Sequence, residues 1–255
     1  MTEAMEAEFD TVAAWTAQVA AKLGPDYHVP AGCRGSGSPA ALDWLIDRMG
    51  LGPGVRLLDS GAGVGGPAAY AAQSHSVLPV LVDPEIGACC AAKKLFGFPV
   101  ACADGSALPV PDQSFDAAWL LGVLCTTANQ RALLEELRRT VRTGGRIGVL
   151  AFVAHREIAR DELAGNHFPT SDGLLELVER SGLKVEDWKG TSALPPIPET
   201  WSRRVETVEK ALGDRYGHQE AWRLAERQSS AIANLLDDGA LTGELLVLRH
   251  ALRTL

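Results

Sequence analysis

Residues 55–70 read VRLLDSGAGVGGPAAY: a short apolar run, an acid, a group of glycines and the start of a helical pattern. The apolar run has the length of a buried strand, and Asp59 closes it. Gly61, Gly63 and Gly65 allow a tight turn and let a ligand approach the backbone without Cβ atoms in the way. The helix expected from Pro67 directs its free N–H groups to the same point. This combination is typical of a loop that binds a nucleotide-type cofactor.

Apolar runs and helical patterns alternate along most of the chain. The runs after the glycine loop cover 77–82, 99–103, 115–124, 146–153, 183–188 and 243–253. Such alternation predicts βαβ units, hence an α/β fold with a Rossmann-like, doubly wound and mostly parallel sheet. Pro79 removes a backbone donor, so the second strand is expected to start at Val80 or to begin irregularly.

Several residues indicate where helices begin and end. An amphipathic helix over 8–23 should end at Gly24-Pro25, and Ser38 should cap a helix that ends at Gly50. Asn129 should cap a further helix that ends at Gly144-Gly145. That helix is expected to carry an exposed Glu135–Arg139 pair.

Two segments fall outside the alternating pattern. The glycine-rich segment 27–37 is a linker or a lid over a pocket, and 199–237 reads as two helices beside the cofactor cleft. We therefore expect four parts: an N-terminal helix and lid (1–38), an α/β core (39–194), a helical cap (195–240) and the last core strand (241–255).

Composition narrows the class of protein. A formal net charge of -8 argues against a nucleic-acid partner, although a local arginine patch stays open. No window approaches the roughly 18 apolar residues of a membrane span, and the acidic N-terminus is unlike a signal peptide, so a cytoplasmic protein is expected. The five cysteines form no CxxC pair and have no histidine at metal spacing, which predicts no metal site.

Three acids follow successive apolar runs and should meet at one rim of the sheet. Asp59 can hold an amino-bearing group, Asp83 can accept hydrogen bonds from ribose hydroxyls, and Asp104 can accept one from an adenine amine. The glycines also match the dinucleotide fingerprint, which leaves a nicotinamide-dependent oxidoreductase open. The negative charge of Asp59 would not help to bind a pyrophosphate, whereas it suits the ammonium group of a sulfonium amino acid. Replacing Asp59 should matter little in an oxidoreductase.

These motifs together resemble the class I S-adenosylmethionine-dependent methyltransferases, nearest to the bacterial small-molecule group that includes ubiquinone and natural-product enzymes. The resemblance covers about residues 40–153 and rests on the glycine loop, the three acids, Phe115-Asp116 and the stretch from Leu134 to Gly145. It implies a seven-stranded sheet whose last strand is antiparallel. The cofactor-binding residues that it implies are Asp59, Gly61, Ala62, Gly63, Gly65, Asp83, Pro84, Asp104, Gly105, Ser106, Leu121 and Gly122.

The implied reaction is methyl transfer from S-adenosylmethionine to an oxygen, nitrogen or carbon nucleophile of a small-molecule acceptor, in bacterial secondary metabolism. After the fourth strand many relatives have an acid–histidine pair where this chain has Cys125-Thr126. That departure keeps a second reading open: a protein that binds the cofactor without transferring methyl, as a cyclase-like catalyst or binding subunit.

Residues for the acceptor are less sharply indicated. The candidate general bases are His155, His167 and His28. Tyr27, Cys33 and an apolar roof containing Trp201 are the further candidates for contact with the acceptor. The sequence does not identify the acceptor. It is also compatible with a homodimer.

Overall fold

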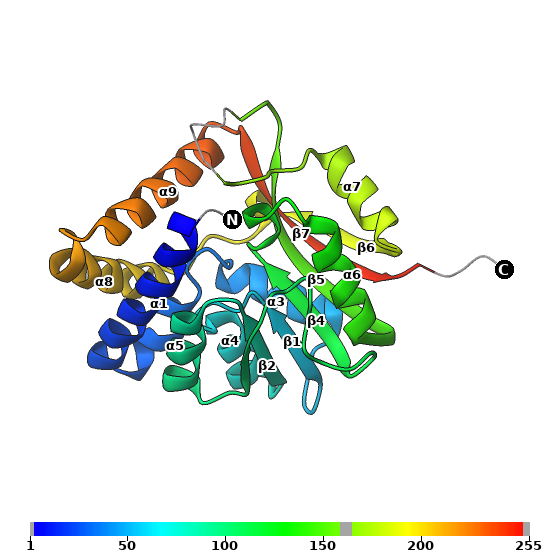
Figure 1. Cartoon of the computed structure of the whole chain (residues 1–255), viewed down its shortest axis with the longest axis horizontal. Helices are drawn as coiled ribbons and strands as arrows, with labels where there is room; N and C mark the ends of the chain where they lie inside the picture. The colour runs from blue at the N-terminus through cyan, green and yellow to red at the C-terminus, as the bar shows by residue number, and fades with distance from the viewer. Residues whose placement is uncertain (1–2, 159–164, 252–255) are drawn as a thin grey trace.

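The computed structural model describes residues 3–158 and 165–251. Its seven strands form one sheet in the order β3-β2-β1-β4-β5-β7-β6 (Figure 1). The strands are β1 (Arg56–Ser60), β2 (Leu78–Asp83), β3 (Val100–Cys102), β4 (Phe115–Leu121), β5 (Val141–Ala154), β6 (Leu183–Gly190) and β7 (Leu241–His250). Strands β1 to β5 pair in parallel, and β7 is antiparallel to both β5 and β6. The predicted fold class is confirmed, including the antiparallel last strand.

Helices cover both faces of the sheet and one end of it. They are α1 (Glu3–Leu23), α2 (His28–Gly32), α3 (Pro39–Met49), α4 (Gly66–His75), α5 (Ile86–Phe96), α6 (Gln130–Thr140), α7 (Ser171–Arg180), α8 (Glu199–Tyr216) and α9 (Glu220–Asp237). Short 3-10 turns lie at Pro25–Tyr27, Leu124–Thr126 and Thr191–Ala193. Among the described helices, none is long and apolar enough to cross a membrane.

The core has two layers because neighbouring strand residues point to opposite faces. On β1, Leu58 packs into the cluster that α6 and α7 cover, whereas Leu57 packs into the cluster beneath α3. Residues Leu246 and Leu245 of β7 divide in the same way. Continuous apolar strands are therefore buried on both sides, as a parallel sheet requires.

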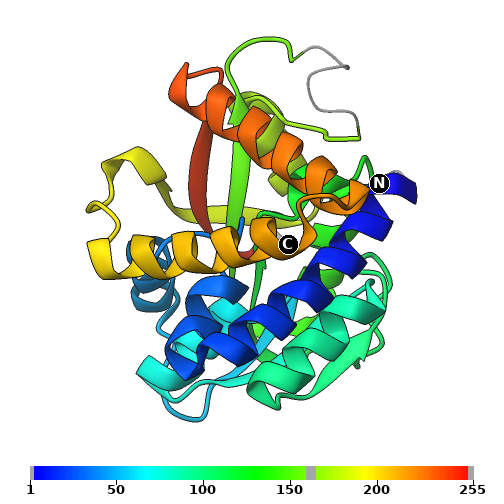
Figure 2. The same ribbon diagram turned by 90° about the vertical axis from the view of Figure 1, so that its left-hand side faces the viewer.

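A third apolar cluster lies outside the sheet. It joins α1, α8 and α9 through residues such as Val12, Val208, Leu212 and Trp222. Figure 2 shows these three helices as one layer, with α1 also lying along α5. We call α1, α2, α8 and α9 the cap.

Most predicted helix ends are confirmed. The Ser38 side chain accepts a hydrogen bond from the Ala41 N–H at 3.3 Å, and Gly50 ends α3 with a left-handed backbone (φ 66°). α1 ends at Leu23, just before Gly24-Pro25.

The expectation for Pro79 was wrong. β2 starts at Leu78, and Pro79 lies in regular register with Leu57 of β1. Leu78 donates toward β1 and Leu81 donates to Pro99 O, so the alternation turns the Pro79 nitrogen to the β3 side. β3 begins only opposite Leu81, so no strand there requires a donor from Pro79.

The predicted end of α6 was also wrong. The helix stops at Thr140, and β5 begins at Val141, so Gly144-Gly145 lies inside the strand. A register shift between Phe115 and Ala117 accommodates these glycines. Asn129 occupies the N-cap position, but its side chain makes no capping hydrogen bond.

Candidate active site

Asp83 at the end of β2 joins two structures that surround the predicted cofactor position. Its Oδ2 accepts a hydrogen bond from the Gly63 N–H at 2.7 Å, and its Oδ1 accepts one from the Glu85 N–H at 3.0 Å. The carboxylate thereby ties the glycine loop to the start of α5. Burial raises the pKa of Asp83 above its usual range, against the lowering effect of these two hydrogen bonds.

Asp59 lies in β1 directly beneath the glycine loop. It is 2 % exposed, and its Oδ2 has no hydrogen-bond partner; the hydroxyl of Ser60 next to it also lacks one. Burial raises the pKa of Asp59 to about 7, and the charge of Asp83 adds to the increase, while the Trp119 indole opposes it. An unpaired buried carboxylate is unfavourable, so this group fits a ligand or a water that carries hydrogen-bond donors.

The glycine loop is held against β2 and leaves one residue open to a ligand. The Gly61 and Ala62 N–H groups donate to Val82 O at 2.8 and 3.1 Å. A Cβ atom at Gly61 would overlap Val123, and one at Gly65 would lie 2.7 Å from Leu81 Cδ2. At Gly63, whose φ is 53°, nothing lies within 4 Å of that position. Two glycines are therefore required by packing, and the third faces open space.

A cavity of about 540 Å³ starts at this loop. Its first part is lined by Gly61, Ala62, Gly63, Val64, Asp83, Pro84, Glu85, Ala88, Leu121 and Gly122. Seven of the residues predicted to bind the cofactor are in this set: Gly61, Ala62, Gly63, Asp83, Pro84, Leu121 and Gly122. Asp59 and Gly65 support the loop from below.

The cavity continues to a second wall made mostly by the cap. α1 and α9 supply the largest share: Phe9, Val12, Ala13, Thr16, Ala225, Gln228, Ser229, Ile232, Ala233 and Leu236. Arg34, Gly35 and Ser36 line it from the segment after α2. The segment judged to be a linker or a lid thus borders the cavity.

The predicted adenine segment lies beside the end of β1, outside the cavity lining. A Cβ atom at Gly105 would lie 3.1 Å from the Ser60 hydroxyl oxygen. Asp104 Oδ1 accepts hydrogen bonds from the Ser106 N–H at 2.7 Å and the Ser106 hydroxyl at 2.8 Å. These bonds give the turn a fixed shape, with the Asp104 side chain exposed.

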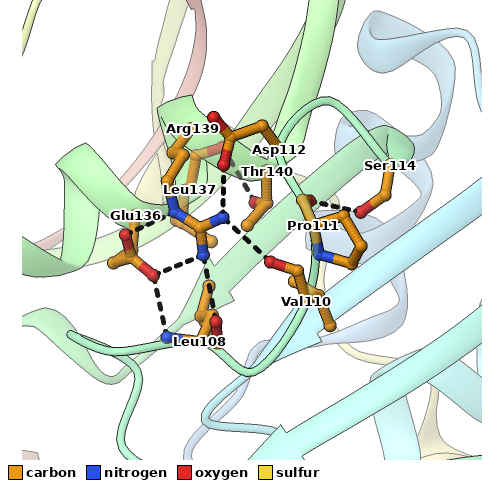
Figure 3. A network of polar contacts seen from close by, with 9 residues as sticks. All are labelled: Leu108, Val110, Pro111, Asp112, Ser114, Glu136, Leu137, Arg139 and Thr140. Carbon is orange, nitrogen blue, oxygen red and sulfur yellow. Dashed lines mark hydrogen bonds and ion pairs between the residues drawn. The ribbon is translucent and has the colours of Figure 1, made fainter.

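Arg139 of α6 anchors the continuation of this segment (Figure 3). Its guanidinium donates to Leu108 O at 3.0 Å and to Val110 O at 2.8 Å, and it forms ion pairs with Glu136 and Asp112 at 2.7 Å. Glu136 in turn accepts a hydrogen bond from the Leu108 N–H. The expected Glu135–Arg139 pair was wrong: Glu135 pairs with Arg131 instead.

The structure places the three predicted bases outside the cavity lining. His155 is exposed and lies 2.9 Å from the Thr242 hydroxyl, and the His167 main chain bonds to Cys125 and Gln130. His28 packs edge-on against Phe96, with a buried Nε2 that has no partner. Of the residues described, no histidine borders the cavity. Their catalytic role stays a prediction.

The other acceptor candidates are also outside the lining. Tyr27 packs against the cap cluster, and the ring of Trp201 lies edge-on to Tyr70 at 6.1 Å. Cys33 is buried, and burial raises the pKa of its thiol well above the usual range. The sequence did not predict Arg34 or the α9 residues as part of the cavity. Its glycine-rich composition did indicate the segment around Arg34 as a linker or a lid.

Known proteins resemble this chain in sequence and in fold. A family model described as a methyltransferase domain matches residues 58–149, from within β1 into β5. Residues 58–149 are therefore similar to methyltransferase domains. The match covers the glycine loop and the acids Asp59, Asp83 and Asp104. The predicted resemblance is confirmed at the level of domain and fold.

Two curated relatives align with less than half of this chain. A demethylmenaquinone methyltransferase of Corynebacterium urealyticum is 33% identical over 105 residues, which is 41% of this chain and 45% of the relative. One of Mycobacterium sp. (strain KMS) is 35% identical over 104 residues, 41% of this chain and 44% of the relative. The alignments span less than half the length of these relatives.

Solved structures resemble the fold over more than four fifths of this chain. The [4+2]-cyclase SpnF is 22% identical with a TM-score of 0.65, covering 83% of this chain and 80% of that one. An S-adenosylmethionine-dependent methyltransferase from Geobacter sulfurreducens, solved with S-adenosyl-L-homocysteine, is 19% identical with a TM-score of 0.61, covering 84% and 91%. These likenesses concern the fold.

Proposed function

We propose that the chain binds S-adenosylmethionine in the cavity and transfers its methyl group to a small-molecule acceptor. The observation that carries this proposal is that two unlike walls line one and the same cavity. One wall is the glycine loop, Asp83 and Gly122, at the carboxyl ends of the central strands. The other is the mostly apolar face of α1 and α9. A cofactor on the first wall would face an acceptor on the second.

Each part of the first wall fits one part of the cofactor. The two oxygens of Asp83 each have an acceptor position left after bonding Gly63 and Glu85, which suits the two ribose hydroxyls. Asp59, with its free Oδ2, and the open backbone at Gly63 suit the amino-acid part. The segment Asp104-Gly105-Ser106 is proposed for adenine, and Leu121 with Gly122 for the floor beneath the sulfonium.

The lining indicates how such a transfer would be catalysed. S-adenosylmethionine supplies an activated methyl group, and the chain's own residues orient the acceptor and exclude water. Cys125 is the thiol in the lining, and burial raises its pKa to about 12, so it is protonated near neutral pH. With no imidazole among the described lining residues, we assign most of the rate to positioning rather than to general base catalysis.

The same observation favours one second candidate, a catalyst that keeps the cofactor fold without transferring methyl. Such a reaction needs no base beside the sulfonium, which matches the lining. The mass of the product separates the two candidates. A product heavier by one methyl group supports transfer, and a rearranged product of unchanged mass supports the second candidate.

The cellular context, the partners and the division into parts are also proposals. We propose that the chain acts within bacterial secondary metabolism in the cytoplasm, without a nucleic-acid partner, and as a monomer or homodimer. We also propose the division into an N-terminal helix with a lid segment (1–38), a core (39–194 with 241–255) and a helical insertion (195–240), and the cap defined above draws its helices from the first and third of these parts.

Calorimetric titration tests the cofactor part. The unmodified protein, Asp83→Ala and a control with an exposed acid on α3, Asp47→Ala, are each titrated with S-adenosylmethionine, S-adenosylhomocysteine and NAD. We expect binding of the first two ligands by the parent and the control, and a loss of about 100-fold in Asp83→Ala, as two hydrogen bonds to a charged group disappear. Binding of NAD alone would contradict the proposal, as would unchanged affinity in Asp83→Ala.

A further inference from the structure

We propose that the acceptor carries an anionic oxygen group, such as a carboxylate, on an apolar body, and that Arg34 binds this group. The inference rests on the proposed function, because it places the acceptor beside a cofactor in the same cavity. It starts from the position of a single cation in the cap wall.

Arg34 is held in place by neutral partners. Its guanidinium lies over the Trp222 ring at 5.6 Å from the ring centre, and its Nη2 donates to the Ser229 hydroxyl at 3.0 Å. Within residues 3–158 and 165–251, no carboxylate lies within ion-pair distance of it. A guanidinium has five N–H donors in a rigid fork, so donors remain for a ligand.

The backbone around Arg34 places its side chain on the side of the cavity proposed for the acceptor. The backbone of Gly32 and Gly35 lies so close to Gly66 and Gly122 that a Cβ atom on either of the latter would overlap it. This backbone therefore forms the cofactor side of the segment. The Arg34 side chain extends the other way, to Trp222 and Ser229 of α9.

The rest of the second wall determines what the anion would be attached to. Its apolar members come from three elements and include Phe9, Val12, Phe152, Ile232 and Leu236. Glu209 also borders the cavity, but it is exposed on α8 and lies outside ion-pair distance of Arg34. Arg34 is partly buried beside these apolar walls and has no countercharge within ion-pair distance among the described residues, so an anionic ligand would supply the missing charge.

Calorimetry with matched acid and amide probes tests the proposal. The protein is first saturated with S-adenosylhomocysteine, and is then titrated with benzoate, benzamide, 2-naphthoate and 2-naphthamide. Each amide copies the shape of its acid without the charge. In the parent we expect at least one acid to bind about tenfold more tightly than its amide. Arg34→Met should abolish this preference, and Arg34→Lys should keep part of it.

Arg227→Met is the matched control, because Arg227 is an exposed arginine on α9 outside the cavity lining. It should leave the preference unchanged. High salt should reduce the ratio of acid affinity to amide affinity in the parent. This measurement needs no variant.

Three results would overturn the proposal: equal binding of acids and amides in the parent, a preference that survives Arg34→Met, or a preference indifferent to salt. If Arg34→Met instead weakens S-adenosylhomocysteine binding and leaves the acid preference intact, the residue serves the cofactor. Failure of the proposed function is distinguishable, since then neither the parent nor the control would bind S-adenosylhomocysteine.

Discussion

Asp59 shows how a single residue can oppose folding while preparing a site. Its carboxyl is buried in β1 with one oxygen unpaired, and burial raises its pKa to about 7. The folded protein therefore holds a proton at this site at pH values where the unfolded chain has released it. The stabilising effect of that proton is complete below the ordinary pKa of the carboxyl and is lost as the pH rises toward 7.

Asp59→Asn should relieve this loss. The neutral isostere should raise the midpoint of thermal unfolding by about 5 °C or more at pH 8.5, where the parent must bury a charge, and should leave it unchanged near pH 4. Thermal unfolding across this range is the measurement. The same variant should bind S-adenosylmethionine more weakly. Equal midpoints at pH 8.5 would argue that the carboxylate is compensated in the folded protein.

Gly66 is a residue whose lack of a side chain holds two elements together. A Cβ atom there would overlap the main chain at Gly32 and Cys33, where α2 meets the start of α4. Gly66→Ala should therefore cost about 1–3 kcal/mol of unfolding free energy, since backbone cannot move aside as a side chain can. Denaturant unfolding measures it. Gly52→Ala is the control, because nothing lies within 4 Å of its Cβ position.

At the scale of elements, side chains of α6 hold the neighbouring loop of residues 108–112 in place. Arg139 bonds to Leu108, Val110 and Asp112, and its hydrogen bond to Glu136 lowers the pKa of that carboxyl (Figure 3). The contribution of Glu136 to stability is thus present at neutral pH and lost as the pH falls below its ordinary pKa. α6 therefore holds residues 108–112, which follow the Asp104-Gly105-Ser106 turn proposed for adenine binding.

Arg139→Met should loosen this segment. We expect affinity for S-adenosylhomocysteine to fall about fivefold or more, because the adenine contacts must then be ordered during binding. Arg131→Met serves as the control, since Arg131 forms an exposed ion pair with Glu135 on the same helix. Calorimetry compares the two. Equal affinities would mean that the segment keeps its shape without Arg139 or takes no part in cofactor binding.

At the scale of the molecule, the cap has an apolar core separate from that of the sheet. Val12, Val208, Leu212 and Trp222 form a cluster of their own, apart from the two layers on β1 to β7. A satellite core of this size can open without unfolding the sheet. The cavity lies at the junction of these units, so opening of the cap would admit ligands.

Hydrogen exchange should reveal this division. Amides of α1 and α9 should exchange faster than those of β1 and β4, and S-adenosylhomocysteine should slow exchange in α1, whose Phe9, Val12 and Thr16 line the cavity. Mass spectrometry of peptides after exchange resolves these elements. Uniform protection of cap and sheet would show that they open together.

Local patterns were sufficient to predict the alternating fold, the glycine turn after β1 and the positions of Asp59, Asp83 and Asp104 near the ends of β1, β2 and β3. Strand periodicity, caps such as Ser38 and the turn at Gly61 depend on neighbours along the chain. Local patterns gave wrong boundaries where an element distant in the sequence determines where a strand starts or a helix ends. Pro79 is tolerated because β3 is too short to reach it, and α6 ends early because β4 pairs with residues that continue the chain.

The wall proposed for the acceptor was decided by the tertiary structure alone. Arg34 and Ser229 bond across 195 positions of sequence, and no local pattern relates Phe9 to Ile232. A cofactor loop is built from one continuous stretch, so its residues and spacing can be recognised in the chain. A cavity between a cap and a sheet is built from side chains on separate helices, and only their packing brings those side chains to one surface.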